Sequence, residues 1–358
     1  MYYKADVDMM EGHRVNIAAV LSARDMPLSA TTKDCVNPPG KAEWPQIRAD
    51  LIGDISVAWL RTCFRGKLLY ALRDAQSCGA FEGVAAERRK RLIAAARDYD
   101  LVELEEGSDL TDELLKAIPP AKRMISWRGS TSSAAELLSI FEQIAIPARF
   151  YSIITNAKFP CDGLQPLLLL KMLGRKDLCA FAEGPFGLWS RLLSPYLGSP
   201  FVFGHLSDRD RLTTDYGFPD LRSIRKLFGM VGSKSFQSPS PRLHNAAYQA
   251  LGYPALFLPF YVECFQEFWR DLVEPHSFDA LGLSLQGFVM VSPHKEAALA
   301  AAAEASLIAR KAGATNVMVH RKGIWEAHTA DPDSISNCLL YTSPSPRDTE
   351  RSRMPSSA

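Results

Sequence analysis

The sequence predicts an α/β protein in which a (β/α)8 barrel is followed by a second, small α/β domain. Eight short apolar runs alternate with amphipathic stretches over residues 15–203. That alternation is typical of a parallel sheet covered by helices. A polar stretch follows, and a new apolar run after it predicts the first strand of the second domain. For the first domain, periodicity alone also allows a doubly wound open sheet.

Each predicted strand is bounded by turn or helix signals. The eight runs are 15–21, 46–50, 67–72, 100–104, 123–127, 148–154, 178–182 and 201–203. Between two of them, residues 85–96 form an amphipathic helix with Leu92, Ile93 and Ala96 on one face. The basic run 88–91 is expected to be largely solvated. In a barrel of this kind, functional side chains lie at the C-terminal ends of the strands.

Changes in composition predict the domain boundaries. We expect the barrel to occupy residues 1–208, a polar linker 209–225 and the second domain 226–337. The apolar run that begins at Lys226 and ends in glycine opens the second domain. Residues 338–358 are similar to one reading frame of a transposase adapter used to prepare sequencing libraries. We therefore expect them to be no part of the native fold.

Composition excludes several function classes. The 358 residues are 47% hydrophobic and 23% charged, with a formal net charge of +1, so no nucleic-acid or anionic-membrane partner is indicated. No apolar run approaches the roughly 20 residues that span a bilayer, and the N-terminus is no secretory signal. We expect a cytoplasmic protein with reduced thiols and no zinc site. The seven cysteines are 35, 63, 78, 161, 179, 264 and 338.

Polar residues of the second domain suit the redox chemistry of a small polyhydroxylated acid. Ser238 and Ser240 open the turn Ser-Pro-Ser-Pro-Arg-Leu-His-Asn, and hydroxyl donors at a helix start bind anions well. Lys295 follows Pro-His, and further along the chain stand Asn316 and Asp331. Together these residues supply two hydroxyls, an ammonium, a carboxamide and a carboxylate.

This order of motifs resembles the substrate domain of the shikimate dehydrogenases. The resemblance implies that Ser238 and Ser240 hold the substrate carboxylate and that Asn316 also binds the substrate. It implies that Lys295, paired with Asp331, moves the proton while the nicotinamide of NADP takes or gives hydride. No Gly-x-Gly-x-x-Gly occurs in the chain, so we expect the cofactor domain to be absent and this chain by itself to be inactive.

Two segments of the second domain depart from that family's pattern. Val289, Met290 and Val291 stand where the family has Asn or Ser, Val and Thr, which removes a hydroxyl expected to touch the substrate. Residues 329–334 are an altered version of Asn-Thr-Asp-x-x-Gly.

The barrel carries three arginines at predicted strand ends. Arg48 lies in Gln-Ile-Arg-Ala-Asp, Arg73 follows the third run, and Arg191 ends Gly-Pro-Phe-Gly-Leu-Trp-Ser-Arg. These motifs resemble type I 3-dehydroquinate dehydratases. Guanidinium groups bind carboxylates bidentately, so the three arginines are expected to hold the carboxylate of a hydroxyl-rich ring. Paired surface arginines are the alternative interpretation.

The same resemblance predicts that the barrel has lost its covalent chemistry. The family uses a lysine that forms a Schiff base with the substrate ketone, and a histidine that moves protons. Ser152 stands at the lysine position and Arg128 at the histidine position. A hydroxyl forms no iminium, and a guanidinium with a pKa above about 12 is a poor general base. Lys158 lies six residues beyond the strand position and is a poor substitute.

We therefore interpret the chain as part of a fused aromatic-pathway enzyme that takes a small-molecule substrate. It joins a dehydratase-like barrel to the substrate domain of a shikimate dehydrogenase, which reduces 3-dehydroshikimate to shikimate. One alternative is that both activities are retained, and another is a non-catalytic ligand-binding or scaffold protein. The sequence leaves the oligomeric state open.

Overall fold

A computed structural model describes most of the chain. The residues described are 17–21, 44–75, 79–131, 133–205 and 224–331. The chain divides into two compact units, residues 1–285 and 286–358, and each is described by itself. The predicted linker, except residues 224 and 225, and the predicted adapter-like tail lie outside the described residues.

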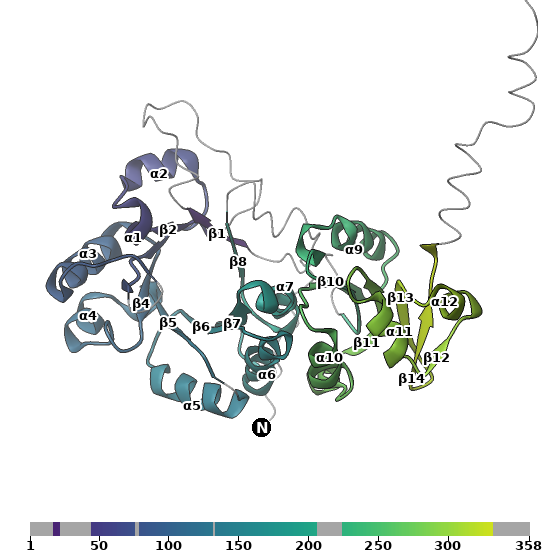
Figure 1. Ribbon diagram of the computed structural model, residues 1–358. Helices are drawn as coiled ribbons and strands as arrows, with labels where there is room; N and C mark the ends of the chain where they lie inside the picture. The colour runs from purple at the N-terminus through teal and green to yellow at the C-terminus, as the bar shows by residue number, and fades with distance from the viewer. Residues whose placement is uncertain (1–16, 22–43, 76–78, 132, 206–223, 332–358) are drawn as a thin grey trace, which may run out of the picture. The chain divides into compact units, whose positions relative to one another are not determined.

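The first unit contains a parallel sheet of eight strands in the order β7-β6-β5-β4-β3-β2-β1-β8 (Figure 1). The strands are β1 (Ile17–Leu21), β2 (Gln46–Arg48), β3 (Leu69–Ala71), β4 (Leu101–Glu105), β5 (Arg123–Gly129), β6 (Phe150–Asn156), β7 (Leu178–Glu183) and β8 (Val202–His205). Side chains connect the two ends of this order, since Cys179 Sγ donates to Phe201 O at 3.4 Å and the rings of Phe181 and Phe203 lie 6.1 Å apart. The predicted (β/α)8 architecture is confirmed, and each of the eight predicted runs overlaps one strand.

Helices follow most of the strands and surround them (Figure 1). They are α1 (Ala49–Ile52), α2 (Val57–Cys63), α3 (Ala85–Asp98), α4 (Asp112–Ala117), α5 (Ala134–Ile144), α6 (Leu164–Leu173) and α7 (Leu188–Leu193), with short turns η2 (Pro120–Lys122), η3 (Pro160–Gly163), η4 (Pro185–Gly187) and η5 (Ser194–Leu197). The predicted strand 46–50 ends early, at Arg48. Asp50 already belongs to α1, where its carboxylate binds the Arg48 side chain.

The expectation of a solvated basic run on α3 is wrong for Arg88. Only 3% of this residue is exposed. Its guanidinium donates to both oxygens of Asp109, at 2.9 and 2.7 Å, and to the carboxylate of Glu105. The helix lies against the sheet at this position, and the two carboxylates compensate for burial of the charge.

Alternation along the strands sorts their side chains into two layers. One apolar cluster contains Leu69, Leu101 and Met124 together with aromatic rings, and it forms the interior of the barrel. The other contains Tyr70 and Val102 and packs beneath the helices. Interior positions further along the strands, towards their C-terminal ends, are polar and form the first candidate site.

The first unit continues beyond the barrel with two parallel strands, β9 (Lys226–Val231) and β10 (Ala255–Phe260). The run predicted as a buried strand from Lys226 is β9. The other elements of this part of the first unit are η6 (Ser235–Gln237), α9 (Ser240–Ala250), α10 (Phe265–Phe268), the π-helical turn η7 (Trp269–Val273) and η8 (Ser277–Leu281). Trp189 of α7 is fully buried, and its ring lies 5.6 Å from that of Phe260 and 5.3 Å from that of Phe278.

The second unit is a small sheet with two helices. Its strands follow the order β11-β13-β14-β12, with β11 antiparallel to β13, β13 antiparallel to β14, and β12 parallel to β14. The elements are β11 (Ser284–Met290), which begins at the boundary, α11 (Lys295–Ala301), β12 (Glu304–Ala305), α12 (Leu307–Ala312), β13 (Val317–Arg321) and β14 (Ile324–His328). Apolar side chains at alternate strand positions, such as Met318 and Ala327, form its core.

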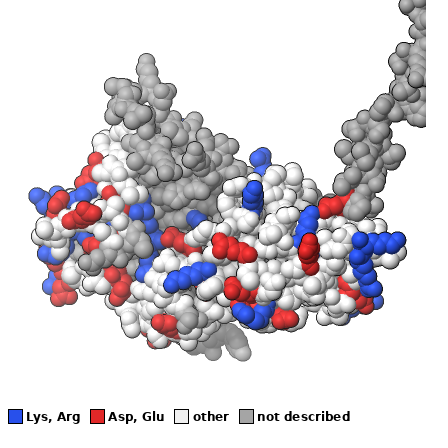
Figure 2. All heavy atoms as spheres, in the orientation of Figure 1, with Lys and Arg blue, Asp and Glu red and all other residues white. Residues whose placement is uncertain are grey.

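No helix among the described residues has both the length and the apolar character needed to cross a bilayer. On the face shown in Figure 2, Lys and Arg are interspersed with Asp and Glu.

Candidate functional site

A buried carboxylate, Glu103, lies at the centre of the polar cluster inside the barrel. It accepts hydrogen bonds from Gln46 Nε2 at 2.9 Å and from Arg73 Nε and Nη2, both at 3.3 Å. Burial opposes its ionisation, but the guanidinium groups of Arg73, Arg128 and Arg48 outweigh burial and lower the pKa of Glu103 to about 2. Two predicted substrate-binding arginines, Arg48 and Arg73, therefore act on the same internal carboxylate.

Arg48 and Arg73 also differ in their immediate surroundings. Arg48 forms a bidentate pair with Asp50, at 2.9 and 2.6 Å. Arg73 is 7% exposed, and burial, followed by repulsion from Arg128, lowers its pKa to about 10. The charged form of Arg73 is thus under electrostatic strain that an additional anion would relieve.

Arg128, at the position where the resemblance places a histidine, is buried and forms an ion pair with the partly exposed Glu183. Its Nη1 donates to Glu183 Oε1 at 2.9 Å, and its Nη2 lies 3.9 Å from Glu103 Oε1. Only 5% of the Arg128 side chain is exposed. Burial disfavours the charged form of Glu183, but Arg128, Arg73 and Arg191 outweigh it and lower the pKa of this carboxyl. The three charges join β4, β5 and β7 across the interior.

The loop before Arg191 holds that residue in place through backbone contacts. A side chain at Gly187 would come within 2.4 Å of the Ala182 carbonyl oxygen, so only glycine allows this approach. The buried Ser190 hydroxyl accepts from the Ala182 amide at 2.9 Å and donates to the Gly187 carbonyl at 2.7 Å. Arg191 Nη1 donates to Phe203 O at 3.4 Å. The conformation of this motif thus fixes α7 on the end of β7.

Ser152 faces the barrel interior from the middle of β6. It is fully buried and is the register partner of Ser126 on β5 and of Cys179 on β7. Lys158 lies in the exposed loop after β6, where its backbone amide donates to Asp162 Oδ2 at 2.8 Å. The amine of Lys158 is therefore carried by a different element from the Ser152 hydroxyl.

In the second part of the first unit, the two predicted anion-binding serines contact each other. Ser238 Oγ accepts from the Ser240 amide at 3.2 Å and donates to Ser240 Oγ at 3.1 Å. Both are half-buried at the start of α9. The turn thus places two hydroxyls beside the positive end of an eleven-residue helix.

Further along the same motif, His244 and Asn245 attach α9 to β10. Asn245 donates to Phe257 O at 3.0 Å and accepts from the Phe257 amide at 2.7 Å. The ring of His244 stacks on that of Phe257 with centroids 4.2 Å apart, and burial lowers the pKa of this histidine. These two residues fix the orientation of the helix that carries the serines.

In the second unit, Asp331 contacts both the Lys295 ammonium and the Asn316 amide, the two groups that the sequence analysis identified. Lys295 Nζ donates to Asp331 Oδ2 at 2.6 Å, and Asn316 Nδ2 donates to Asp331 Oδ1 at 2.5 Å. Asn316 Oδ1 accepts from the Ala330 amide at 3.0 Å, which fixes its orientation. The hydrogen bond from Lys295 lowers the pKa of Asp331 more than its limited burial raises it, and Asn316 adds to this effect. The three side chains form one connected network.

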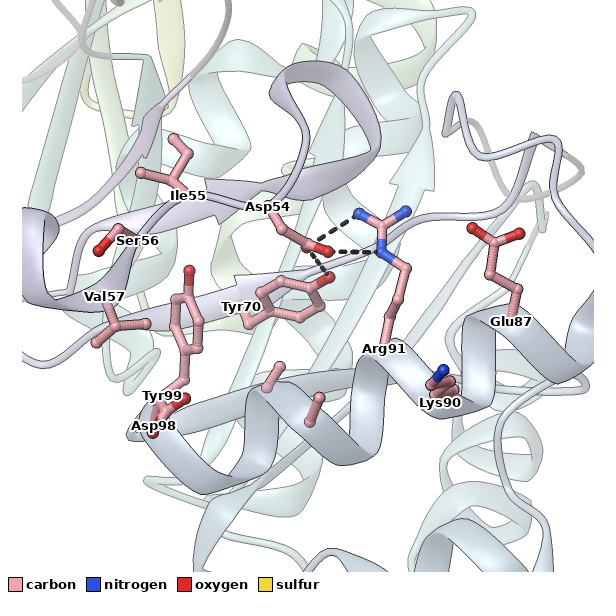
Figure 3. A pocket seen from close by; sticks show the side chains of 12 residues that line it. Asp54, Ile55, Ser56, Val57, Tyr70, Glu87, Lys90, Arg91, Asp98 and Tyr99 are labelled. Carbon is pink, nitrogen blue, oxygen red and sulfur yellow. Dashed lines mark hydrogen bonds and ion pairs between the residues drawn. The ribbon is translucent and has the colours of Figure 1, made fainter. Parts of the chain in front are cut away.

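A surface hollow of about 510 Å³ lies elsewhere on the first unit, between α3 and the segment before α2 (Figure 3). There Arg91 binds Asp54 through two hydrogen bonds of 3.0 Å, and Tyr70 donates to the same carboxylate at 2.6 Å. The hollow belongs to the outer layer of the barrel. Within the described ranges, no three acidic, histidine or cysteine side chains are grouped as they would be around a metal ion.

The fold and these residues define a (β/α)8-barrel protein fused to a small α/β substrate-binding domain. The family model described as type I 3-dehydroquinase matches residues 46–235, more than half of the chain, and the chain belongs to that family. The model described as the substrate-binding domain of shikimate dehydrogenase matches residues 230–318. The chain thus combines the two domains that occur together in bifunctional enzymes of the shikimate pathway.

Three curated relatives illustrate this composition. A 3-dehydroquinate dehydratase of Dehalococcoides mccartyi is 31% identical over 177 residues, which are 48% of this chain and 78% of the relative. The chloroplastic bifunctional 3-dehydroquinate dehydratase/shikimate dehydrogenase of Arabidopsis thaliana is 25% identical over 78% of this chain and 49% of the relative. A shikimate dehydrogenase (NADP(+)) of Bacillus mycoides is 33% identical over 36% of this chain and 44% of the relative. The match therefore covers about half the length of the bifunctional relative and less than half the length of the shikimate dehydrogenase.

Sequence reasoning missed the two carboxylates that organise the barrel interior, Glu103 and Glu183. A signal for Glu103 was present, because the run Leu-Val-Glu-Leu-Glu alternates charged and apolar residues within a strand that is buried on both faces. Such a charge requires a buried partner.

Proposed function

We propose that the second domain binds the substrate of a shikimate dehydrogenase and handles the proton of its redox reaction. In the reduction of 3-dehydroshikimate, the carbonyl carbon gains a hydride and its oxygen gains a proton. Lys295 is the proton donor in this proposal, and Asp331 keeps its ammonium oriented. Ser238, Ser240 and Asn316 hold the substrate.

The observation that carries this proposal is the network of Lys295, Asp331 and Asn316. Its ammonium–carboxylate contact is 2.6 Å, with 30% and 49% of the two side chains exposed. An exposed ion pair of this kind contributes little to stability. An ammonium fixed by a carboxylate that is itself fixed by an amide suits a group that repeatedly gives up and regains a proton.

Reduced NADP (NADPH) would supply the hydride and be oxidised to NADP+, as the dehydrogenase resemblance implies. The described residues contain no glycine-rich strand–turn–helix that would hold a dinucleotide pyrophosphate, and so do not fit this cofactor. We therefore assign no residue to cofactor binding and limit the reaction steps to the proton.

We further propose that the barrel binds carboxylated rings without forming a Schiff base. At position 152 the side chain is a hydroxyl, and at position 128 a buried guanidinium is paired with Glu183. Neither provides the amine or the general base that Schiff-base dehydration needs. Arg191, and Arg73, whose charged form is disfavoured by burial and by Arg128, support retention of an anion-binding function.

Borohydride trapping tests the chemical part of this proposal. Incubation with 3-dehydroquinate and borohydride should leave the intact mass of the protein unchanged, because Ser152 offers no amine. A parallel sample of a related dehydratase that has the lysine should gain the reduced adduct. A stable adduct on this chain would contradict the proposal, and a Lys158→Ala variant would then show whether Lys158 is its site.

Retention of both activities, with Lys158 replacing the missing amine, is disfavoured because Lys158 lies on the loop after β6. A purely ligand-binding or scaffold protein remains the alternative for the dehydrogenase half. Retention of the Lys295 and Asp331 pair favours catalysis, because binding alone does not require a proton donor. Turnover of a Lys295→Ala enzyme, completed with a cofactor domain, separates these two alternatives.

A further inference from the structure

The hollow in the outer layer of the barrel has a volume of about 510 Å³, which suits a small organic molecule (Figure 3). On α3 it is lined by Ala94 and Ala95, whose short side chains leave the space open. Ile55 and Val57 line it from the segment at the start of α2, and Tyr99 lines it just after the end of α3. Apolar side chains on two sides and an aromatic ring suit the apolar body of a ligand.

Tyr99 contributes a buried hydroxyl to this lining. Only 4% of the residue is exposed, and its Oη has no hydrogen-bond partner among the described residues. The neighbouring Tyr70, whose ring centroid lies 5.0 Å away, donates its own hydroxyl to Asp54 at 2.6 Å. Buried polar groups are normally hydrogen-bonded, so the Tyr99 hydroxyl favours a ligand with a polar group at this end.

The charges around Tyr99 favour a cation. Asp98, the last residue of α3, also lines the hollow and forms no ion pair with a described residue. Asp54, in contrast, is already paired with Arg91 at 3.0 Å. Burial, and then the carboxylates of Asp54 and Asp98, raise the pKa of Tyr99, so the potential at its hydroxyl is negative. The faces of tyrosine rings also attract cations.

The other unpaired charges of the lining lie further along α3. At the usual helical rise, Lys90 is about 12 Å from Asp98 along the axis of this helix. Glu87 precedes Lys90 by one turn, so the two opposite charges offset each other. A small cation bound beside Tyr99 therefore stays away from the Lys90 ammonium.

We infer that the hollow binds a small organic cation, an ammonium carried by an aromatic or short hydrocarbon body. The ammonium lies at Asp98 and donates to the Tyr99 hydroxyl, and the body packs against Ala94. This site lies outside the arginine cluster of the barrel interior, and the inference does not depend on the proposed function of either domain.

Calorimetric titration with three probes tests the inference. 2-Phenylethylammonium, 2-phenylethanol and 3-phenylpropanoate carry a positive, a neutral and a negative end group on the same ring and spacer. Ala94→Leu places a larger side chain in the hollow at an exposed position, so the difference between the parent and this variant reports on the hollow alone. In that difference the ammonium should bind roughly 3- to 10-fold more tightly than the alcohol, and the carboxylate should not bind.

Two further variants test the polar end of the hollow. Asp98→Asn and Tyr99→Phe should each weaken ammonium binding roughly 3-fold. The Tyr99 hydroxyl has no described partner, so Tyr99→Phe should keep the circular dichroism spectrum and unfolding midpoint of the parent. Ala86→Leu, also exposed on α3 but outside the lining, is the matched control and should bind the ammonium like the parent.

Three results would overturn the inference. The first is an ammonium affinity no higher than that of the alcohol, which includes the absence of binding. The second is ammonium binding that Ala94→Leu leaves unchanged, since the cation would then lie elsewhere on the protein. The third is parental ammonium affinity in both Asp98→Asn and Tyr99→Phe.

Discussion

Replacing Glu103 by glutamine isolates the charge at the centre of the barrel. Glutamine keeps the shape of the side chain and an amide oxygen that accepts from Gln46. It removes the negative charge on which Arg48, Arg73 and Arg128 act. The three guanidinium groups would then repel one another in a buried setting without their shared partner.

The pKa of Glu103 gives the size of the stability that the protein would lose with this charge. A pKa of about 2, against an ordinary 4.5, corresponds to about 3 kcal/mol of stabilisation at neutral pH. Because the pKa is lower in the folded protein, the contribution is present above about pH 4.5 and is lost as the pH falls toward 2. Glu103→Gln should therefore unfold about 3 kcal/mol more easily at pH 6. The difference from the parent should shrink by more than about 1 kcal/mol at pH 3.5.

Urea unfolding followed by circular dichroism, repeated from pH 6 to pH 3.5, measures both quantities. The matched control is Glu113→Gln on α4, whose carboxylate pairs with Arg89 but is 63% exposed. The control should change stability by less than about 0.5 kcal/mol at every pH. Parental stability of Glu103→Gln at pH 6, or a difference that stays constant down to pH 3.5, would refute the electrostatic reasoning.

Other substitutions test the second domain. In an enzyme completed with its cofactor domain, Lys295→Ala should lower turnover far more than it weakens shikimate binding, and Asp331→Asn should act in the same direction, as steady-state kinetics will show. Asn245→Ala should destabilise the protein by about 1–3 kcal/mol in urea unfolding, because both the amide and the carbonyl of Phe257 lose their partner. Val291→Thr, measured by calorimetry, should tighten shikimate binding by about 1 kcal/mol.

The barrel could be predicted from the sequence because its strands are short apolar runs separated by helices. Each predicted run overlaps a strand, and errors lie at the ends. Position 50 is an example, since Asp50 was assigned to a strand and lies in α1. The end of this strand could not be predicted from local apolar patterning, because it coincides with a side-chain contact, the pairing of Asp50 with Arg48.

Buried charge was the part that patterning could not predict. Arg88 stands in a run of basic residues and was assigned to solvent, yet it is buried against Glu105 and Asp109. The two carboxylates are 17 and 21 residues away in the chain, so only the packing of α3 on the sheet brings them together. The resemblance to the shikimate dehydrogenases was more informative for Lys295 and Asp331, which are 36 residues apart and in contact.

The two halves of the chain keep their ion pairs for different physical reasons. Arg128 is 5% exposed, lowers the pKa of the buried Glu103 and pairs with Glu183, so its removal would weaken the compensation of a buried charge and destabilise the barrel. Lys295 and Asp331 are 30% and 49% exposed, and a pair in that setting contributes about 0–1 kcal/mol. Stability therefore accounts for the charges in the barrel and leaves the lysine and aspartate of the second domain unexplained. A function that needs a movable proton explains that pair, and this is why the dehydrogenase half is the better candidate for catalysis.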